Sequence, residues 1–461
     1  MEFENPVTLP DLKIILISKD SKQLQELVSG GHPAVIAEAF PVLSPEEAGK
    51  VLKQIQQPER SEIFSHLEPD QQLDIVDLLR RDELSSLFAE MSPDDRADLF
   101  KRLPEERRES ILPGLAQAER EDLRRLASYE EGTAGSVMTS DYATVLPEQT
   151  VDQAIAHLRT IAPDRETIYY AYVIDHDRRL LGFVSLKDLI LARKDSRIQE
   201  IMHREVISAR VDEDQEEAAA KIQRFDLLAL PVINGGDSLV GIITHDDAMD
   251  ILTQEYTEDV EMLMAITGSH DGGTYIRMSP WVHFRNRAPW VIILALAGLV
   301  SGFVVQRFEG LLQQFAILAV FMPMLADTGG NTGSQSATLV VRALAMKEIS
   351  SRDVLRILRK ELIIALLLGV MLGVIAYGRV VFFSGGAFSS ETFPMYAIGF
   401  AVALALGLQV LTSTLIGSVL PLLASALKLD PALIASPAIT TIVDITGLVI
   451  YFSTVKFVLG V

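Results

Sequence analysis

A run of polar residues interrupts an otherwise apolar stretch between Leu311 and Ala345. From Leu325 the chain reads LADTGGNTGSQSATL, which places Asp327, Asn331 and Gln335 four residues apart. At this spacing the three side chains share one face if the segment is helical. Polar backbone and side chains at membrane depth need hydrogen bonds from protein or from a water-filled cavity. The run therefore predicts the wall of a pore or substrate path, although its small residues also suit a tight packing seam between helices.

A second acidic residue stands within a different apolar stretch. Asp444 lies in SPAITTIVDITGLVIYF, with apolar residues on both sides. An ionisable side chain within a membrane span is energetically costly and usually faces a bundle interior or an aqueous path. Asp444 is therefore the first candidate for the functional centre of the membrane part.

The chemistry of these residues favours a cation. A carboxylate attracts cations, and amide or main-chain carbonyls add oxygen ligands, which suit a magnesium ion that keeps several of its waters. Calcium, manganese and protons remain alternatives on this chemistry. The triplet Asp327-Thr328-Gly329 also matches the D-T-G of aspartic proteases, with Asp444 as a partner carboxylate. No G-x-G-D accompanies Asp444, so we predict that the protein is not an enzyme.

The composition separates the chain into an acidic part and a membrane part. Before Ser279 there are 29 Lys and Arg against 54 Asp and Glu, and from Ser279 onward there are 12 against 8. Such an acidic region repels nucleic acid and attracts cations. The chain has no cysteine, which excludes disulfides and cysteine-based metal or redox chemistry.

Five apolar stretches are long enough to span a membrane, since about 20 residues cross the hydrocarbon core. They run at about 289–307, 311–346, 361–383, 393–424 and 437–459. The opening sequence MEFENPVTLPDLK lacks the features of a signal peptide, which predicts a cytoplasmic amino terminus. Six Lys and Arg between residues 342 and 360 then lie in one cytoplasmic loop, as the positive-inside rule requires. We expect a multi-pass protein of the cell (inner) membrane, in contact with lipid, with its carboxyl terminus outside.

The first 132 residues contain a helical repeat. LSPEEAGKVL, LEPDQQLDIV and MSPDDRADLF begin at Leu43, Leu67 and Met91, which is a period of 24 residues. Each copy has a proline suited to the first helical turn and acidic residues that favour a helix amino end. Stacked helix pairs bury a core that a single repeat could not bury, which predicts an α-helical solenoid over residues 1–132.

A second repeat follows, in which short strands alternate with helices. VMTSDYATVLPEQTVDQAIAHLR at Val137 parallels IMHREVISARVDEDQEEAAAKIQ at Ile201, and LLGFVSLKDLI parallels LVGIITHDDAMDIL. These residues resemble a tandem pair of cystathionine-β-synthase (CBS) domains, at about 137–198 and 199–253 within residues 133–253. The resemblance implies an α/β fold.

The two glycine turns of this pair are candidates for nucleotide binding. They contain Ser185 with Asp188, and Thr244 with Asp247. By resemblance to the family, these side chains would bind ATP or another adenosine nucleotide. A hydroxyl at a helix amino end also simply caps the helix, and capping needs no ligand.

Residues 254–280 connect the soluble part to the membrane domain at 281–461. QEYTEDVEMLMAIT, from Gln254 to Thr267, is helix-like, with acidic residues on one side and apolar residues on the other. An aromatic and basic belt typical of a membrane interface follows from Trp281 to Arg287. A connecting helix here would transmit movement of the soluble domains to an all-α membrane domain.

As a whole the chain resembles the MgtE family of magnesium channels and transporters. The resemblance rests on the domain order, on the polar run after Pro323 and on PAITTIVDITG near Asp444. It implies a homodimer whose pore is lined by the second and fifth spans of both subunits. It further implies that Asp444 holds hydrated Mg²⁺, aided by backbone oxygens around Gly330, Gly333 and Thr440.

The resemblance also implies that cytoplasmic Mg²⁺ bound between acidic domains holds the pore shut. The candidate residues are Asp430 at the cytoplasmic mouth, Asp259 on the connecting helix, Asp226 in the second CBS unit, and Glu62, Asp94 and Asp98 in the helical domain. Each of these could equally be a solvated surface carboxylate. Family resemblance assigns Asp327 no role.

Two other functions remain alternatives on the sequence. An ion-coupled secondary transporter of divalent cations would have a similar membrane site. A nucleotide sensor with a membrane anchor would use the CBS pair alone, but the polar run and Asp444 argue against a mere anchor.

Overall fold

The computed structural model describes residues 21–266, 278–350, 352–383, 393–431 and 436–461. These form two compact units, one of the described residues up to Glu255 and one of those from Tyr256 onward. The amino-terminal sequence without signal features, residues 267–277 of the predicted connecting segment and the predicted loop at 384–392 lie outside the described residues.

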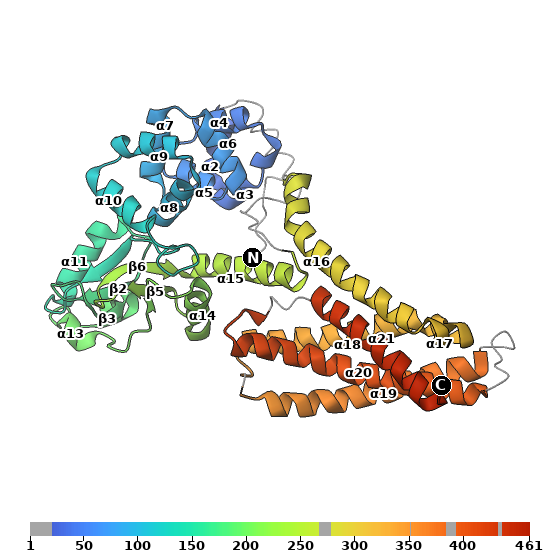
Figure 1. The fold of residues 1–461 in the computed structure, drawn as a ribbon. Helices are drawn as coiled ribbons and strands as arrows, with labels where there is room; N and C mark the ends of the chain where they lie inside the picture. The colour runs from blue at the N-terminus through green and yellow to red at the C-terminus, as the bar shows by residue number, and fades with distance from the viewer. Residues whose placement is uncertain (1–20, 267–277, 351, 384–392, 432–435) are drawn as a thin grey trace. The chain divides into compact units, whose positions relative to one another are not determined.

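The first unit begins with a stack of short helices (Figure 1). They are α2 (Ser21–Gly30), α3 (Pro33–Ala37), α4 (Pro45–Leu52), α5 (Glu59–Ser65), α6 (Pro69–Leu78), α7 (Arg81–Glu90), α8 (Pro93–Arg102), α9 (Glu105–Ile111) and α10 (Gln117–Leu126). Short 3₁₀ helices at Phe40–Val42 and Leu112–Gly114 complete this part.

The 24-residue period is visible in the way these helices start. Pro45, Pro69 and Pro93 occupy the first helical positions of α4, α6 and α8, where a missing N–H costs no hydrogen bond. The apolar residue two positions before each proline is buried. The structure extends the series by one step, since Leu115 is also buried and precedes α10. Each repeat thus contributes one apolar residue to a continuous core.

The CBS part contains two three-stranded sheets of the same topology. Each pairs its first two strands in parallel and its last two antiparallel. The first sheet has β1 (Tyr142–Val145), β2 (Thr167–Ile174) and β3 (Leu180–Ser185), and the second has β4 (Ala209–Arg210), β5 (Ala229–Ile233) and β6 (Leu239–Thr244). The helices are α11 (Val151–Ile161), α12 (Leu186–Leu191), α13 (Ile198–Ile201) and α14 (Gln215–Phe225), with a 3₁₀ helix at Ala162–Asp164.

The two CBS repeats exchange their leading segments. Thr139, at the start of the first repeat, bonds in both directions with Ile242 on β6, at 2.8 and 3.0 Å. His203, at the start of the second repeat, bonds in both directions with Phe183 on β3, at 3.0 and 2.9 Å. We call each of these exchanged pairings a crossing. At both crossings the strand has a glycine, Gly182 or Gly241, since a Cβ there would meet the exchanged segment. The exchange makes the two repeats one folded body.

The last helix of the CBS part, α15, runs without a break from His245 to Leu263. It begins directly after Thr244, so the helix predicted from Gln254 is the continuation of a helix that starts nine residues earlier. Because α15 crosses the boundary near Glu255, it is the described connection between the two units.

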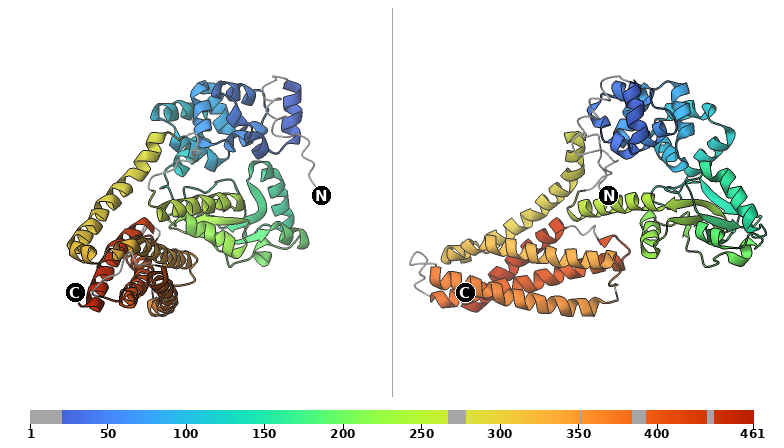
Figure 2. Two further views of the ribbon diagram at one scale, coloured as in Figure 1. Left: turned by 90° about the vertical axis from the view of Figure 1, so that its right-hand side faces the viewer. Right: turned by 180° about the vertical axis from the view of Figure 1, so that it is seen from behind.

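The second unit consists of long helices. They are α16 (Pro280–Arg307), the short α17 (Glu309–Gln314), α18 (Ile317–Ala345), α19 (Val354–Phe383), α20 (Met395–Ala426) and α21 (Ser436–Leu459). In Figure 2, α18 to α21 lie side by side, and α16 contacts α21. Within the described residues, α16, α19, α20 and α21 are long and apolar enough to cross a membrane. α18 falls short of that apolarity because of its polar run.

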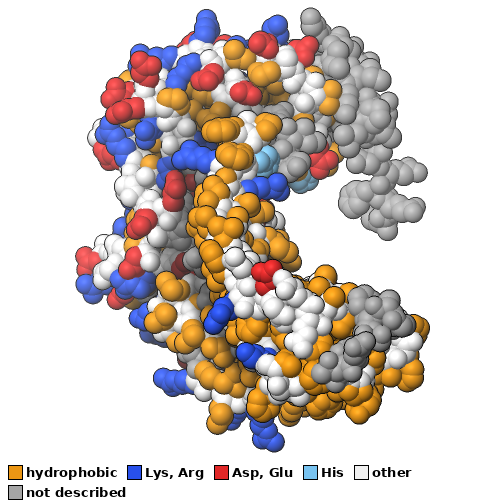
Figure 3. Space-filling view, turned by 45° about the vertical axis from the view of Figure 1, so that its right-hand side comes forward, with side chains coloured by type: hydrophobic (Ala, Val, Ile, Leu, Met, Phe, Trp, Pro, Cys, Tyr) orange, Lys and Arg blue, Asp and Glu red, His pale blue; other side chains and the backbone are white. Residues whose placement is uncertain are grey.

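The outer faces of the second unit are apolar. Figure 3 shows hydrophobic side chains covering these helices. On α16 and α19, Leu296, Phe303, Leu367 and Val370 are more than 60% exposed. Helices with such faces must be covered by lipid or by another protein surface.

The glycine crossings give a stability prediction. In Gly182→Ala the added Cβ would lie 2.5 Å from the His203 carbonyl oxygen. Such overpacking costs about 1–3 kcal/mol, so the free energy of opening of β3 should fall by that amount in native-state hydrogen exchange. Gly235→Ala is the matched control, since the nearest atom to its Cβ lies 3.8 Å away. Equal protection of β3 in both variants would contradict the crossing.

Candidate ion path and acidic pocket

The polar run lies on a continuous helix. α18 passes from Ile317 to Ala345 without unwinding, so the irregular backbone considered at Asp327 to Ser336 is absent there. Asp327, Asn331 and Gln335 are all exposed on one face, as their spacing predicts. The Asn331 side-chain amide donates to the Asp327 carboxylate at 3.2 Å. The face therefore carries a preformed polar pair.

The opposite face of α18 packs closely against α20 and α21. A Cβ on Gly330 would lie 2.9 Å from the Thr440 methyl group, and one on Gly333 would lie 2.9 Å from the Ser413 hydroxyl. The Ser334 and Thr440 hydroxyls lie 3.5 Å apart. The structure thus brings the three predicted residues Gly330, Gly333 and Thr440 together as a helix contact. Their backbone carbonyls belong to regular helices.

Asp444 lies half-buried on α21, one turn beyond Thr440. One of its carboxylate oxygens is buried and has no hydrogen-bond partner among the described residues. An unsatisfied buried carboxylate oxygen requires an explanation such as a bound ion or water. Asp444 is therefore available to hold a hydrated cation.

A buried hydrogen bond links α18 to α19. The Ser336 hydroxyl donates at 2.8 Å to Glu361, which is only 7% exposed. Glu361 is not among the residues predicted from the sequence, and basic residues typical of a membrane surface, Arg359 and Lys360, directly precede it. Its position within the predicted third span, next to Leu362 and Ile363, was the available signal.

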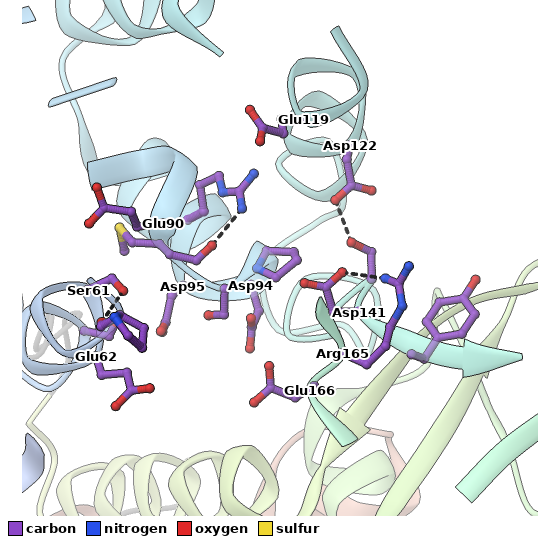
Figure 4. Close-up of a pocket in the computed structure, with 18 of the residues that line it drawn as sticks. Ser61, Glu62, Glu90, Asp94, Asp95, Glu119, Asp122, Asp141, Arg165 and Glu166 are labelled. Carbon is purple, nitrogen blue, oxygen red and sulfur yellow. Dashed lines mark hydrogen bonds and ion pairs between the residues drawn. The ribbon is translucent and has the colours of Figure 1, made fainter. Parts of the chain in front are cut away.

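The first unit contains a large acidic cavity of about 1490 Å³. Its acidic lining residues are Glu62, Glu90, Asp94, Asp95, Glu119, Glu121, Asp122, Asp141, Glu166, Asp246, Asp247 and Asp250, against the basic Arg96, Arg125, Arg165 and Arg178. Figure 4 shows Glu62, Asp94, Asp95 and Glu166 pointing toward one shared space. Ion pairs remove some charge at the rim, as where Arg165 contacts Asp141 at 2.9 Å.

Crowding shifts the ionisation of the pocket carboxyls. Burial, together with Asp247 and Asp95, raises the pKa of Asp94 well above its usual range. Enclosure by the pocket walls, with Asp247 and Asp246 nearby, raises the pKa of Glu166 to about 7. Burial likewise raises the pKa of Asp247 to about 6. Protons or cations are needed to hold these groups together.

The structure separates the predicted acidic residues into two groups. Glu62 and Asp94 line the pocket, whereas Asp98, one turn further along α8, does not and lies 3.9 Å from Lys101. Asp226 is exposed, and its backbone in the left-handed conformation ends α14. In the second unit, Asp259 lies on α15 and Asp430 is exposed just after α20.

Of the twelve acidic residues that line the pocket, nine were not selected from the sequence and one was assigned another role. Glu166 has no motif around it and is recognised only by its surroundings in the fold. Asp247 was predicted as a nucleotide ligand. Across the described part of the chain, no three carboxylate or imidazole groups converge closely enough to hold a bare metal ion.

The two glycine turns have the same local structure but different surroundings. In the first, Asp188 accepts hydrogen bonds from the Ser185 hydroxyl at 2.6 Å and from His203 at 3.1 Å. Burial works against ionisation of Asp188, but these bonds outweigh it and lower its pKa. In the second, the Thr244 hydroxyl donates to Asp247 at 2.5 Å. The Ser185 hydroxyl also accepts from the Asp188 N–H and so caps α12, whereas Asp247 of the second turn lines the acidic pocket.

Comparisons with known proteins match the helical part, the CBS part and most of the membrane part. Residues 322–454 match the family described as a divalent cation transporter, MgtE. Residues 31–132 match the MgtE intracellular N domain, and residues 134–195 and 198–254 each match the CBS domain. The magnesium transporter MgtE of Thermus thermophilus is 40% identical over 334 residues, which cover 72% of each chain. The chain belongs to the MgtE family of magnesium transporters.

Two further comparisons support this assignment. The MgtE of Bacillus subtilis is 36% identical over 327 residues, covering 71% of this chain and 70% of that one. A crystal structure of the cytosolic domain of the Mg²⁺ channel MgtE in complex with ATP is 35% identical, with a TM-score of 0.50, and covers 53% of this chain and all of that one. The expected family, the CBS pair, the multi-pass membrane location with an intracellular N domain and the absence of an enzyme activity are confirmed.

Glu166 gives a prediction for pH. Its raised pKa stabilises the closed pocket fully below about pH 4.5, and this contribution is lost as the pH rises through about 7. Without Mg²⁺, hydrogen-exchange protection of pocket amides, corrected for intrinsic rates, should therefore fall between pH 5 and 8. Glu166→Gln should flatten this slope, and the exposed Glu105→Gln should not. An unchanged slope in Glu166→Gln would contradict the prediction.

Proposed function

We propose that the chain is a Mg²⁺ import channel whose path is lined by α18 and α21. The carrying observation is that a polar face on α18 and the unpartnered carboxylate oxygen of Asp444 on α21 belong to two helices in direct contact. Lipid would penalise both features, whereas a hydrated path accommodates them. The magnesium transporters among its relatives support the choice of ion.

The ligand set suits magnesium with its waters. Asp444 supplies one charge, and the Asp327–Asn331 pair supplies amide and carboxylate oxygens. Mg²⁺ gives up water reluctantly and is usually held through one or two carboxylates. A path with few carboxylates and regular helix backbones at Gly330, Gly333 and Thr440 therefore contacts the ion mainly through its hydration shell.

The proposal includes a homodimer of five-span subunits. α18 is counted as the second span because its polar face would be covered by the same face of a second copy, away from lipid. Five spans place the carboxyl terminus outside when the helical domain is inside. The six Lys and Arg at residues 342–360 then lie on the cytoplasmic side.

The acidic pocket is the proposed sensor of cytoplasmic Mg²⁺. Hydrated Mg²⁺ among Glu62, Asp94 and neighbouring carboxylates would stabilise the closed arrangement, since only a ligand with different affinities for two states shifts their populations. Asp259 and Asp430 are the proposed bridge near the cytoplasmic mouth. Loss of the ions would let the carboxylates repel one another and open the path.

Adenosine nucleotide binding is proposed for the first turn more than for the second. Ser185 and Asp188 lie beside three rings: Phe183 stacks on His203 with centroids 5.0 Å apart, and Tyr170 contacts Phe183 edge to face at 5.3 Å. Such aromatic surfaces suit a purine. One relative of known structure, the cytosolic domain of the Mg²⁺ channel MgtE, was solved in complex with ATP. Asp247 of the second turn lines the acidic pocket, whose negative charge disfavours phosphate.

An ion-coupled secondary transporter is the alternative function. It would share Asp444 but make the uptake rate follow a proton or sodium gradient. Uptake that is independent of both gradients supports the channel.

Removal of the Asp444 charge tests the path. Asp444→Asn should lower Mg²⁺ uptake into vesicles by about tenfold or more, because an interaction with a charged group contributes about 1.5–3 kcal/mol. Glu309→Gln makes the same charge change at an exposed residue of the second unit and should leave uptake unchanged. If Asp444→Asn transports like the wild type, the proposed path is wrong.

Removal of a pocket carboxylate tests the sensor. Asp94→Asn should raise the internal Mg²⁺ concentration that half-inhibits uptake by about fivefold or more, the low end of common coupling energies. Asp98→Asn is the matched control, since it alters a carboxylate on the same helix outside the pocket. A shift of the same size in both variants would assign the effect to general charge.

A further inference from the structure

Gln409 places a buried amide where three membrane helices meet. It lies within α20 and is 1% exposed. Its side-chain nitrogen donates to the Leu325 carbonyl oxygen on α18 at 3.2 Å. Its side-chain oxygen is buried and has no hydrogen-bond partner among the described residues. An apolar side chain of similar size would fill this space without leaving an acceptor unsatisfied.

Two glycines leave room for this amide. A Cβ on Gly329 of α18 or on Gly447 of α21 would overlap the Gln409 side-chain nitrogen. The Gln409 oxygen also faces α21, since that Gly447 Cβ would lie 2.7 Å from it. The amide is therefore clamped between the backbones of the two helices that carry the polar face and Asp444.

The two glycines that contact the Gln409 amide lie close to the residues of the proposed ion path. Gly329 lies between Asp327 and Asn331 in sequence, and Gly447 lies one turn after Asp444. One turn after Gln409 on α20, Ser413 donates to the Gly329 carbonyl oxygen. One turn further, Gly417 approaches the Gly333 backbone. These contacts fix the register of α18 against α20, and Gln409 extends the packing to α21.

We propose that Gln409 is a positioning residue that determines ion specificity by setting the spacing of α18 and α21. This inference rests on the proposed Mg²⁺ path. The coordinating oxygens, those of bound water included, lie at about 2.0–2.1 Å from Mg²⁺ and about 2.3–2.6 Å from Ca²⁺. The two hydrated ions therefore differ in size by a few tenths of an ångström, and a change in helix spacing on that scale alters the discrimination between them. Gln409 acts through Asp444 and the Asp327–Asn331 pair and does not itself contact the ion.

The test compares uptake of Mg²⁺ and Ca²⁺ by the full chain in vesicles. Gln409→Met keeps the side-chain length and removes the amide. It should lower the ratio of Mg²⁺ to Ca²⁺ uptake by about fivefold, which corresponds to the loss of about one hydrogen bond. Gln306→Met, at an exposed position on α16, is the control and should keep the wild-type ratio. A structural role alone would reduce both rates together and leave the ratio unchanged.

A second pair of variants keeps the inference testable if Gln409→Met folds poorly. Gly447→Ala introduces the clash, and Gly447→Ala with Gln409→Asn withdraws the amide by one methylene. The double variant should recover Mg²⁺ uptake relative to Gly447→Ala. A wild-type ratio in folded Gln409→Met, or a double variant no better than Gly447→Ala, would overturn the inference.

Asp444→Asn in the same assay separates the two proposals. Loss of uptake in Asp444→Asn with a wild-type ratio in Gln409→Met overturns only the role of Gln409. Wild-type uptake in Asp444→Asn overturns the path itself.

Discussion

Close contact between helix backbones is the constraint on which the membrane unit depends. At Gly333 and Gly417 the backbones of α18 and α20 approach so closely that neither position has room for a Cβ. Such proximity lets short hydroxyls reach carbonyls on the neighbouring helix, as Ser413 reaches Gly329. Polar groups on this inner face are thereby satisfied within protein, as lipid requires. The outer face of α18 then keeps Asp327 and Asn331 accessible.

The acidic pocket depends on the opposite constraint, in which like charges are held together. The CBS repeats supply two equivalent turns, yet their carboxyls differ, since the pKa of Asp188 is lowered and that of Asp247 is raised to about 6. His203 supplies a partner to the first, whereas Asp246 and Asp95 crowd the second. The same turn motif, present in both repeats, thus places its carboxyl in two different electrostatic environments. Repulsion among the crowded carboxylates favours the binding of a cation nearby, because the cation relieves that repulsion.

The sequence predicted features that depend on local spacing. The common face of Asp327, Asn331 and Gln335 follows from helical geometry, and the 24-residue period follows from prolines at helix starts. It did not distinguish Asp98 from Asp94, although they are one turn apart, because the cavity ends at the first turn of α8. Glu166 and Gln409 have no local motif. Their environments arise from residues far away in the chain, and spacing within one segment carries no information about them.

The continuity of α18 constrains the proposed ion path. Three glycines within five residues, Gly329, Gly330 and Gly333, each cost about 1 kcal/mol of helix propensity relative to alanine. Packing against α20 and α21 must offset this cost, so the geometry of the wall depends on its neighbours. An unwound segment would instead present carbonyl ligands to a bare ion. In the proposed path a regular helix leaves only side chains and water, and discrimination between cations would then depend on the spacing of the helices.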